Sequence, residues 1–108
     1  MYVIYAIINC EFIQLFNFIM EKFVVWGEYC KDAILRREPY RKEHLNRLTS
    51  LKENNILVTL GPTKCNRYVF GIFNANDESE VKELIEKDIY WEMGIWVSFE
   101  IYPWINAF

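Results

Sequence analysis

RYVFGIFNANDESEVKELIEKDIYWEMGIWVSFEIY, residues 67–102, contains three local patterns in succession. Residues 67–73 alternate two sets of mostly large apolar side chains, which predicts a strand. NANDESE then supplies turn residues and acidic side chains, which the dipole favours in the first turn of a helix. Apolar residues follow at helical spacing, and Gly94 is expected to end that helix. Residues 95–102 alternate again and predict a further strand, ended by Pro103.

The preceding residues predict the same kinds of element. Residues 23–28 read as a strand, and KDAILRRE, residues 31–38, as a connection with some helical character. A helix that begins near Pro39 and runs to about residue 54 has an apolar stripe of Leu45, Leu48 and Leu51. Residues 56–60 form the next expected strand, which Gly61 and Pro62 are expected to stop. The whole order is βαββαβ, the ferredoxin-like α+β arrangement with an antiparallel sheet.

The sheet face away from the helices is expected to need a cover. The predicted strands at 67–73 and 95–102 carry large apolar side chains on both faces. Apolar residues make up 53% of the 108 residues and aromatic residues 18%, which is difficult to bury in one small domain. We therefore predict a homodimer in which two sheets pack together as a dimeric α+β barrel.

Charge and cysteine content exclude several classes of protein. A net charge of −3 argues against a nucleic-acid-binding protein, which needs clustered basic residues. The three cysteines, Cys10, Cys30 and Cys65, form no C-x-x-C pair, and there is a single histidine. This spacing predicts neither a zinc site nor a disulfide framework, so we expect no metal or cofactor and a cytoplasmic protein with reduced thiols.

Residues 1–19 are expected to be an apolar extension of a domain that spans residues 20–108. No Lys or Arg precedes the apolar run and polar residues interrupt it, so a signal peptide or membrane span is not expected. The extension could be an extra strand and helix packed on the domain, or a segment upstream of a natural start at Met20. A third reading gives it a role in docking on a partner or a membrane surface.

Several segments together resemble the YciI-like (YCII-related) family over roughly residues 21–105. They are KFVVWGEYCKDAILRREPYRKEHLNRL, the pair Gly61-Pro62, ESEVKELIEKDIYWEMGIW and EIYPW. The resemblance implies a dimeric ferredoxin-like fold and a paired histidine and aspartate, which fall on His44 and Asp88. The family usually has Asp-Pro-aromatic where this chain has Asp88, Ile89 and Tyr90, so the aim of Asp88 is an open question. A relative that eliminates chloride from a chlorinated hydroxyquinol implies proton transfer on a small, oxygen-rich ring.

The residues themselves favour the same pair. His44 is the only histidine and shares a helical row with Leu48 and Leu51. If the second helix continues, Asp88 lies on its core-facing row, where a carboxylate needs a cation or donors. Antiparallel helices bring the end of the second toward the first half of the first. A carboxylate on one imidazole nitrogen raises the basicity of the other, which suits a general base.

Other polar residues are weaker candidates. Arg36, Arg41 and Arg47 are expected to be mostly solvated and paired with Glu38 or Glu43, with Arg41 and Arg36 as candidate anchors for an anionic substrate. Gly61 and Pro62 precede a loop whose N–H groups could bind substrate, and Tyr90 is a candidate pocket wall. Trp91, Trp96 and Trp104 are expected in the core or the dimer interface.

Two functions remain open at this level. The first is a small enzyme that uses His44 and Asp88 for general acid/base chemistry, namely elimination, isomerisation or hydrolysis of a small polar or anionic molecule. The second is a non-catalytic dimer that binds a small ligand in the same cleft.

Overall fold

The structure is a computed structural model, and it describes residues 20–108. The predictions for residues 1–19 lie outside this range. The elements are β1 (Glu21–Tyr29), α2 (Ala33–Arg36), the 3-10 helix η1 (Glu38–Tyr40), α3 (Arg41–Glu53), β2 (Leu57–Pro62), β3 (Tyr68–Ala75), α4 (Glu78–Glu86), α5 (Ile89–Glu92) and β4 (Trp96–Trp104). The predicted βαββαβ order is confirmed, with short helical turns added to each crossover.

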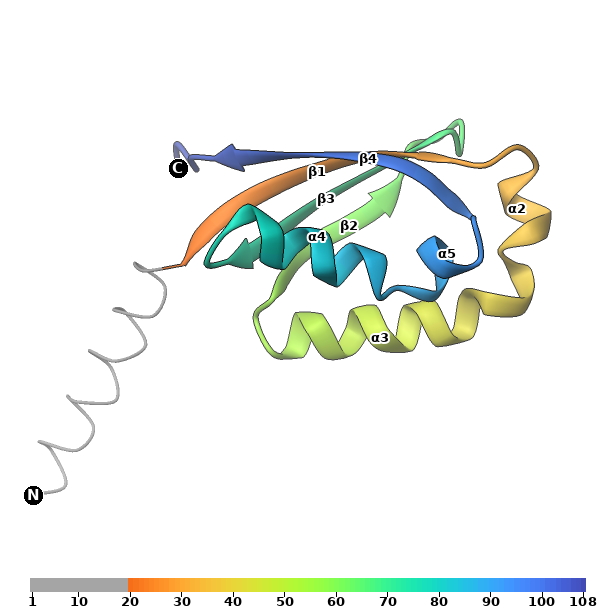
Figure 1. Cartoon of the computed structure of the whole chain (residues 1–108), viewed down its shortest axis with the longest axis horizontal. Coiled ribbons are helices and arrows are strands. Elements are labelled where there is room, and N and C mark those ends of the chain that lie inside the picture. Colours follow the sequence, from red (N-terminus) through yellow and green to blue (C-terminus); the bar gives the residue numbers. More distant parts are fainter. Residues whose placement is uncertain (1–19) are drawn as a thin grey trace, which may run out of the picture.

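One four-stranded sheet organises these elements in the order β2-β3-β1-β4. Each neighbouring pair is antiparallel, and β1 lies between β3 and β4. Figure 1 shows α3, α4 and α5 together on one side of the sheet, which leaves the other side without helices. We call these two sides the covered face and the open face.

The covered face holds the core. Alternate residues of β1 and β3 point toward the helices, and among them Phe23, Val25 and Phe73 are almost fully buried. Helix α4 contributes Val81 and Ile85. Helix α3 differs, because His44 is its only buried residue, while Leu48 and Leu51 are partly buried.

The expected apolar stripe of α3 was partly wrong. Leu45 is 42% exposed, so it does not belong to the inward row. That row is His44, Leu48 and Leu51, which are spaced by four and three residues and so share one face of the helix. A polar residue thus takes the inward place that the leucine pattern assigned to Leu45.

The two prolines predicted to stop strands are the last or next-to-last residues of those strands. β2 ends with Gly61 and Pro62, which pair with Phe70 and Val69, and β4 extends one residue past Pro103. Both strands are at the edges of the sheet, where a missing N–H can face away from the neighbouring strand. The predicted strand ends were therefore correct to within two residues.

The second helix is divided, although the sequence predicted one helix as far as Gly94. α4 ends at Glu86, Asp88 is extended (φ −75°, ψ 139°), and α5 begins at Ile89. The Asp88 side chain caps the new helix by accepting a hydrogen bond from the Tyr90 N–H. Gly94, at φ +70°, closes α5 in the left-handed conformation that glycine adopts readily.

A β-bulge moves Trp96 to the covered face. The register between β1 and β4 shifts between Glu28 and Tyr29, so that Ser98 pairs with Glu28 but Trp96 pairs with Tyr29. Val97 is the extra residue, and it is half exposed. Simple alternation along residues 95–102 would put Trp96 on the same face as Tyr102, which is the open face. In the structure Trp96 lies on the covered face.

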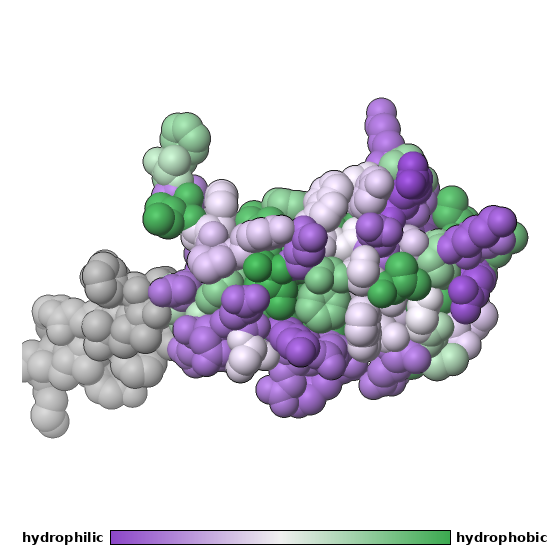
Figure 2. Space-filling view, turned by 45° about the horizontal axis from the view of Figure 1, so that its top comes forward, coloured by the Kyte–Doolittle hydropathy of each residue, from purple (hydrophilic) through white to green (hydrophobic). Residues whose placement is uncertain are grey.

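The open face is rich in large apolar and aromatic side chains. Trp26 and Tyr68 stack there with ring centroids 5.1 Å apart. Figure 2 shows green and pale side chains along the middle of this side, with purple side chains around them. The large side chains that the register places on this face are Val24, Trp26, Tyr68, Phe70, Ile72, Tyr102 and Trp104.

Candidate functional site

A buried histidine and aspartate meet between the helices on the covered face. Nδ1 of His44 lies 2.7 Å from Oδ1 of Asp88, a hydrogen bond that spans 44 residues of sequence. His44 is 4% exposed and Asp88 0%. The predicted approach of the second helical segment to the first half of α3 is therefore present in the structure. Asp88 reaches His44 although Ile89, and not a proline, follows it.

Asp88 is held by further donors besides His44. Its Oδ1 also accepts from the backbone N–H of Tyr90 at 2.9 Å, and its Oδ2 accepts from Arg47 at 3.1 Å. Arg47 in turn donates to the carbonyl oxygen of Leu84 at 2.8 Å. A fully buried carboxylate needs such compensation for its lost hydration. The cap of α5 and a cation from α3 together provide it.

Aromatic rings fix the plane of the His44 imidazole. Tyr90 stacks on it with ring centroids 3.6 Å apart and planes inclined by 10°. Trp96 meets it edge-on at 5.1 Å and 85°. Tyr90 therefore packs against His44 itself, and Trp96 reaches this place only through the β-bulge.

The hydrogen bond to Asp88 determines what His44 can do. With an ionised carboxylate at Nδ1, the ring proton resides on Nδ1 and the lone pair is left on Nε2. No hydrogen bond from within residues 20–108 reaches Nε2. This nitrogen is the atom of the pair that can take a proton from a ligand.

Arg47 was underestimated by the sequence reading. It was expected to be solvated and paired with Glu38 or Glu43, but it pairs with Asp88 and its side chain is 27% exposed. A signal for this position existed, because Arg47 follows His44 by three residues and so lies on the same side of the helix.

The other predicted binding residues form no hydrogen bond or ion pair with His44 or Asp88. Arg36 and Arg41 are exposed, and neither forms an ion pair in the part of the chain that the structure describes. Gly61 and Pro62 are the last two residues of β2, and a turn follows them. None of these four makes a hydrogen bond to His44 or Asp88.

Tyr29, Arg37 and Trp96 form a second polar group beside the pair, and the sequence did not indicate it. Burial raises the pKa of the Tyr29 hydroxyl, while the Trp96 indole N–H and the Arg37 guanidinium oppose that rise. Burial also raises the pKa of Tyr90, which Arg37 again opposes. Arg37 therefore places positive charge near both phenols.

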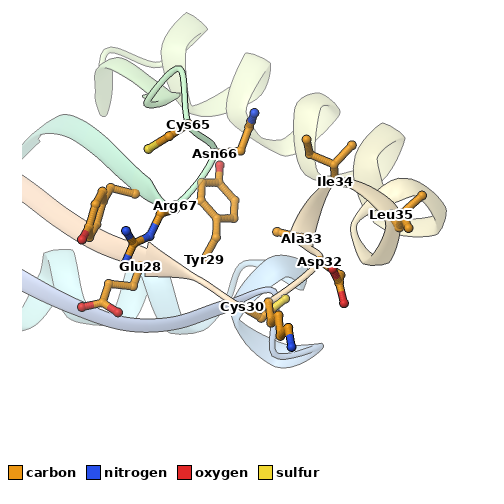
Figure 3. Close-up of a pocket in the computed structure, with 12 residues that line it drawn as sticks. Glu28, Tyr29, Cys30, Asp32, Ala33, Ile34, Leu35, Cys65, Asn66 and Arg67 are labelled. Carbon is orange, nitrogen blue, oxygen red and sulfur yellow. The ribbon is translucent and has the colours of Figure 1, made fainter.

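An open cavity of about 530 Å³ lies at the end of the sheet beside Tyr29. It is bounded by the end of β1, the start of α2 and the turn between β2 and β3 (Figure 3). Its charged lining residues are Glu28, Lys31, Asp32 and Arg67. The cavity is therefore lined by charged side chains of both signs together with apolar ones.

Within residues 20–108, no group of three or more His, Cys, Asp and Glu side chains is arranged to hold a metal ion. In the same range, no helix has the length and apolar character needed to cross a membrane.

Comparisons with known proteins agree with the fold. A family profile described as "YCII-related domain" matches residues 21–105. Among solved structures, the chain is similar to 5-chloro-2-hydroxyhydroquinone dehydrochlorinase from Burkholderia phenoliruptrix AC1100 in complex with 2,5-dihydroxybenzoquinone. The TM-score is 0.68 at 20% sequence identity, and the match covers 80% of this chain and 95% of that chain. No curated protein matches.

Proposed function

The chain belongs to the YCII-related domain family, and from this premise we propose that it is a small enzyme that uses His44 and Asp88 for general acid/base chemistry. One observation carries the proposal, namely the 2.7 Å hydrogen bond between Nδ1 of His44 and Oδ1 of Asp88 in a buried setting. Asp88 orients the ring, and Nε2 is the proton acceptor.

The proposed reaction begins with proton removal. Nε2 takes a proton from an O–H or C–H group of the substrate, and the electron pair left behind forms a new double bond. In an elimination, the leaving group departs with its own bonding pair, and in an isomerisation the proton returns at another atom. Arg47 stays close to Asp88 throughout, so the imidazolium that forms faces a carboxylate already balanced by one cation.

A small oxygen-rich ring is the substrate class that we propose. The solved structure with the same fold is named for a reaction on a chlorinated hydroxyhydroquinone and holds a dihydroxybenzoquinone. Such a ring has acidic O–H groups for Nε2. Arg36 of α2 and Arg41 of α3 are both exposed, and we propose that they attract the negative charge of the ring as it approaches the protein.

The working form in this proposal is a homodimer. The open face exposes Trp26, Phe70 and Trp104 to 38% each and Tyr102 to 52%. Exposed apolar residues that adjoin on one sheet face mark an association surface. A second copy of the same face would cover them and form the dimeric barrel.

Release of chloride from 5-chloro-2-hydroxyhydroquinone tests the catalytic role. His44→Ala and Asp88→Asn are each expected to lower the turnover rate about 10²- to 10⁴-fold, the usual contribution of a general base. Asn46→Ala, a change to an exposed residue of the same helix, is the matched control and should behave like the wild type. Circular dichroism and sedimentation must show that each variant keeps its fold and oligomeric state. Full turnover by a folded His44→Ala protein would contradict the proposal.

A non-catalytic binding protein is the second candidate, and the closed surroundings of His44 favour it. Tyr90 and Trp96 cover two sides of the ring, and Asp88 and Arg47 could serve stability alone. Saturable ligand binding by the wild type without any chloride release or isomerisation would select this function over the enzyme.

A further inference from the structure

Two buried N–H groups near His44 lack an acceptor. Nε1 of Trp96 and Nε of Arg37 are sealed from solvent, and neither meets an acceptor in good geometry within residues 20–108. Trp96 is 5% exposed, so its indole N–H has little access to water. A buried donor without a partner is costly and calls for an explanation.

Both donors converge on one oxygen. The Trp96 N–H and the Arg37 guanidinium lie close enough to the Tyr29 hydroxyl to affect its protonation. Tyr29 pairs with Trp96 across the bulge between β1 and β4, which holds the two side chains on the same face. The Tyr29 oxygen therefore faces donors, and its own proton is best given to an acceptor elsewhere.

The cavity lies on the other side of Tyr29. Tyr29 is 8% exposed and lines the 530 Å³ space with residues of α2 and of the β2–β3 turn. Figure 3 shows its ring standing between Arg67 and Ala33, with the hydroxyl end directed away from β1 toward Asn66. Trp96 also touches the His44 ring, so a single chain of contacts leads from the cavity through Tyr29 and Trp96 to His44.

We propose that this cavity, whose lining does not include His44, is an outer ligand chamber beside the His44 site, and that the Tyr29 hydroxyl donates a hydrogen bond to an ionised ring hydroxyl of a ligand held there. Trp96 and Arg37 are positioning residues that support the Tyr29 oxygen. When the Tyr29 hydroxyl donates its proton to a hydrogen bond with the ligand, the negative charge on the Tyr29 oxygen grows. The interaction of this oxygen with the N–H groups of Trp96 and Arg37 then becomes more favourable. The inference rests on the proposed function for the ligand class and adds the place and the contact.

A titration with 2,5-dihydroxybenzoquinone tests the contact. Isothermal calorimetry is expected to show saturable binding to the wild type, and Tyr29→Phe should raise the dissociation constant about 10- to 100-fold, the effect of one hydrogen bond to a charged group. Tyr102→Phe, which removes a hydroxyl from the open face, is the matched control and should bind as the wild type does. Equal affinity of wild type and Tyr29→Phe, or no saturable binding to the wild type, overturns the proposal.

Cys65 reports whether the probe occupies the cavity. Its exposed thiol lines the space, and hydrogen bonds from Thr63 and from the Arg67 backbone lower its pKa, which favours the reactive thiolate. Bound probe should slow the alkylation of Cys65 by iodoacetamide, measured by peptide mass spectrometry. Saturating probe that leaves the alkylation rate unchanged places the ligand outside the cavity and contradicts the proposal.

The chamber and the catalytic function can fail separately. If the probe protects Cys65 and binds Tyr29→Phe more weakly, but the wild type releases no chloride, the ligand chamber is supported and the catalytic function is contradicted. If Tyr29→Phe releases chloride as fast as the wild type and the probe does not protect Cys65, the catalytic function is supported and the ligand chamber is contradicted.

Discussion

The two faces of the sheet are built from the same strands but serve different purposes. On the covered face, alternate residues of β1 and β3 are buried against helices, and a single polar pair is set among them. On the open face, the intervening residues are mostly aliphatic or aromatic, and Trp26 and Phe70 are each 38% exposed. The difference is that one face is buried within the subunit and holds the polar pair, whereas the other leaves an aromatic surface exposed.

Removing the central carboxylate should be the most damaging change to the covered face. Asp88→Ala leaves His44, Arg47 and the Tyr90 N–H without their shared acceptor. We expect the free energy of unfolding to fall by about 3–5 kcal/mol, as for other buried pairs that lose one partner. Urea denaturation followed by fluorescence measures it. A loss below about 1 kcal/mol would mean that the pair behaves like a surface contact, which would erase the contrast between the faces.

A charge on the open face should act on association and leave folding nearly unchanged. Trp26→Glu places a carboxylate in the middle of the aromatic surface, and we expect the dimer dissociation constant to rise at least about 30-fold, or about 2 kcal/mol. Analytical ultracentrifugation measures this change. Leu45→Glu is the control, since Leu45 is exposed to a similar extent but lies on α3. A dimer that survives Trp26→Glu intact places the interface elsewhere.

A rise to alkaline pH should have the smallest of these effects on stability, and it should act differently through the tyrosines of the two faces. Burial raises the pKa of Tyr29 above its ordinary value of 10.0, so the folded protein holds this proton more tightly than the unfolded chain does. The stability from this group is complete below about pH 10 and is lost as the pH rises through the folded pKa.

Tyr29→Phe should therefore reduce the fall in unfolding free energy above about pH 10. Urea denaturation at a series of pH values measures it. The pKa of Tyr102 on the open face is also raised, mainly by its hydrogen bond to Glu100, but this tyrosine is exposed and its effect is screened. Tyr102→Phe is expected to change the alkaline slope less, and an equal change in both variants would contradict the assignment.

Sequence reasoning was most successful where a local pattern has one structural solution. The alternation of residues 67–73 correctly predicted strand β3, and the helical spacing of the apolar residues after it correctly predicted a helix where α4 lies. Sequence reasoning was least successful where the backbone departs from a regular helix or strand. The Asp88 cap divides a helix that the apolar spacing had joined, and the bulge at Tyr29 turns Trp96 to the other face.

The candidate site was predictable only in its two central residues. His44 and Asp88 were predicted because the family resemblance implies them, and because a lone histidine on an apolar row and a carboxylate on a core-facing segment both need partners. Trp96 was correctly expected in the core or the dimer interface, but its contact with His44 was not predicted. Arg47 was expected to be solvated, and Tyr29 and Arg37 gave no signal. Their roles depend on which atoms lie next to a buried carboxylate or phenol, and residue spacing does not specify that.

The sequence by itself determined the order of strands and helices and the α+β class, because these follow from side-chain periodicity. Its family resemblance indicated the polar pair, which the cost of burying a lone charge supports. Only the tertiary structure decided that Asp88 caps α5, that Arg47 balances it and that Trp96 meets His44. The contacts of Arg47 with Asp88 and of Trp96 with His44 join residues that are 41 and 52 positions apart. They arise when helices and a bulged strand pack against one another, since hydrogen bonds and ring contacts act over a few ångströms in space, whatever the separation along the chain.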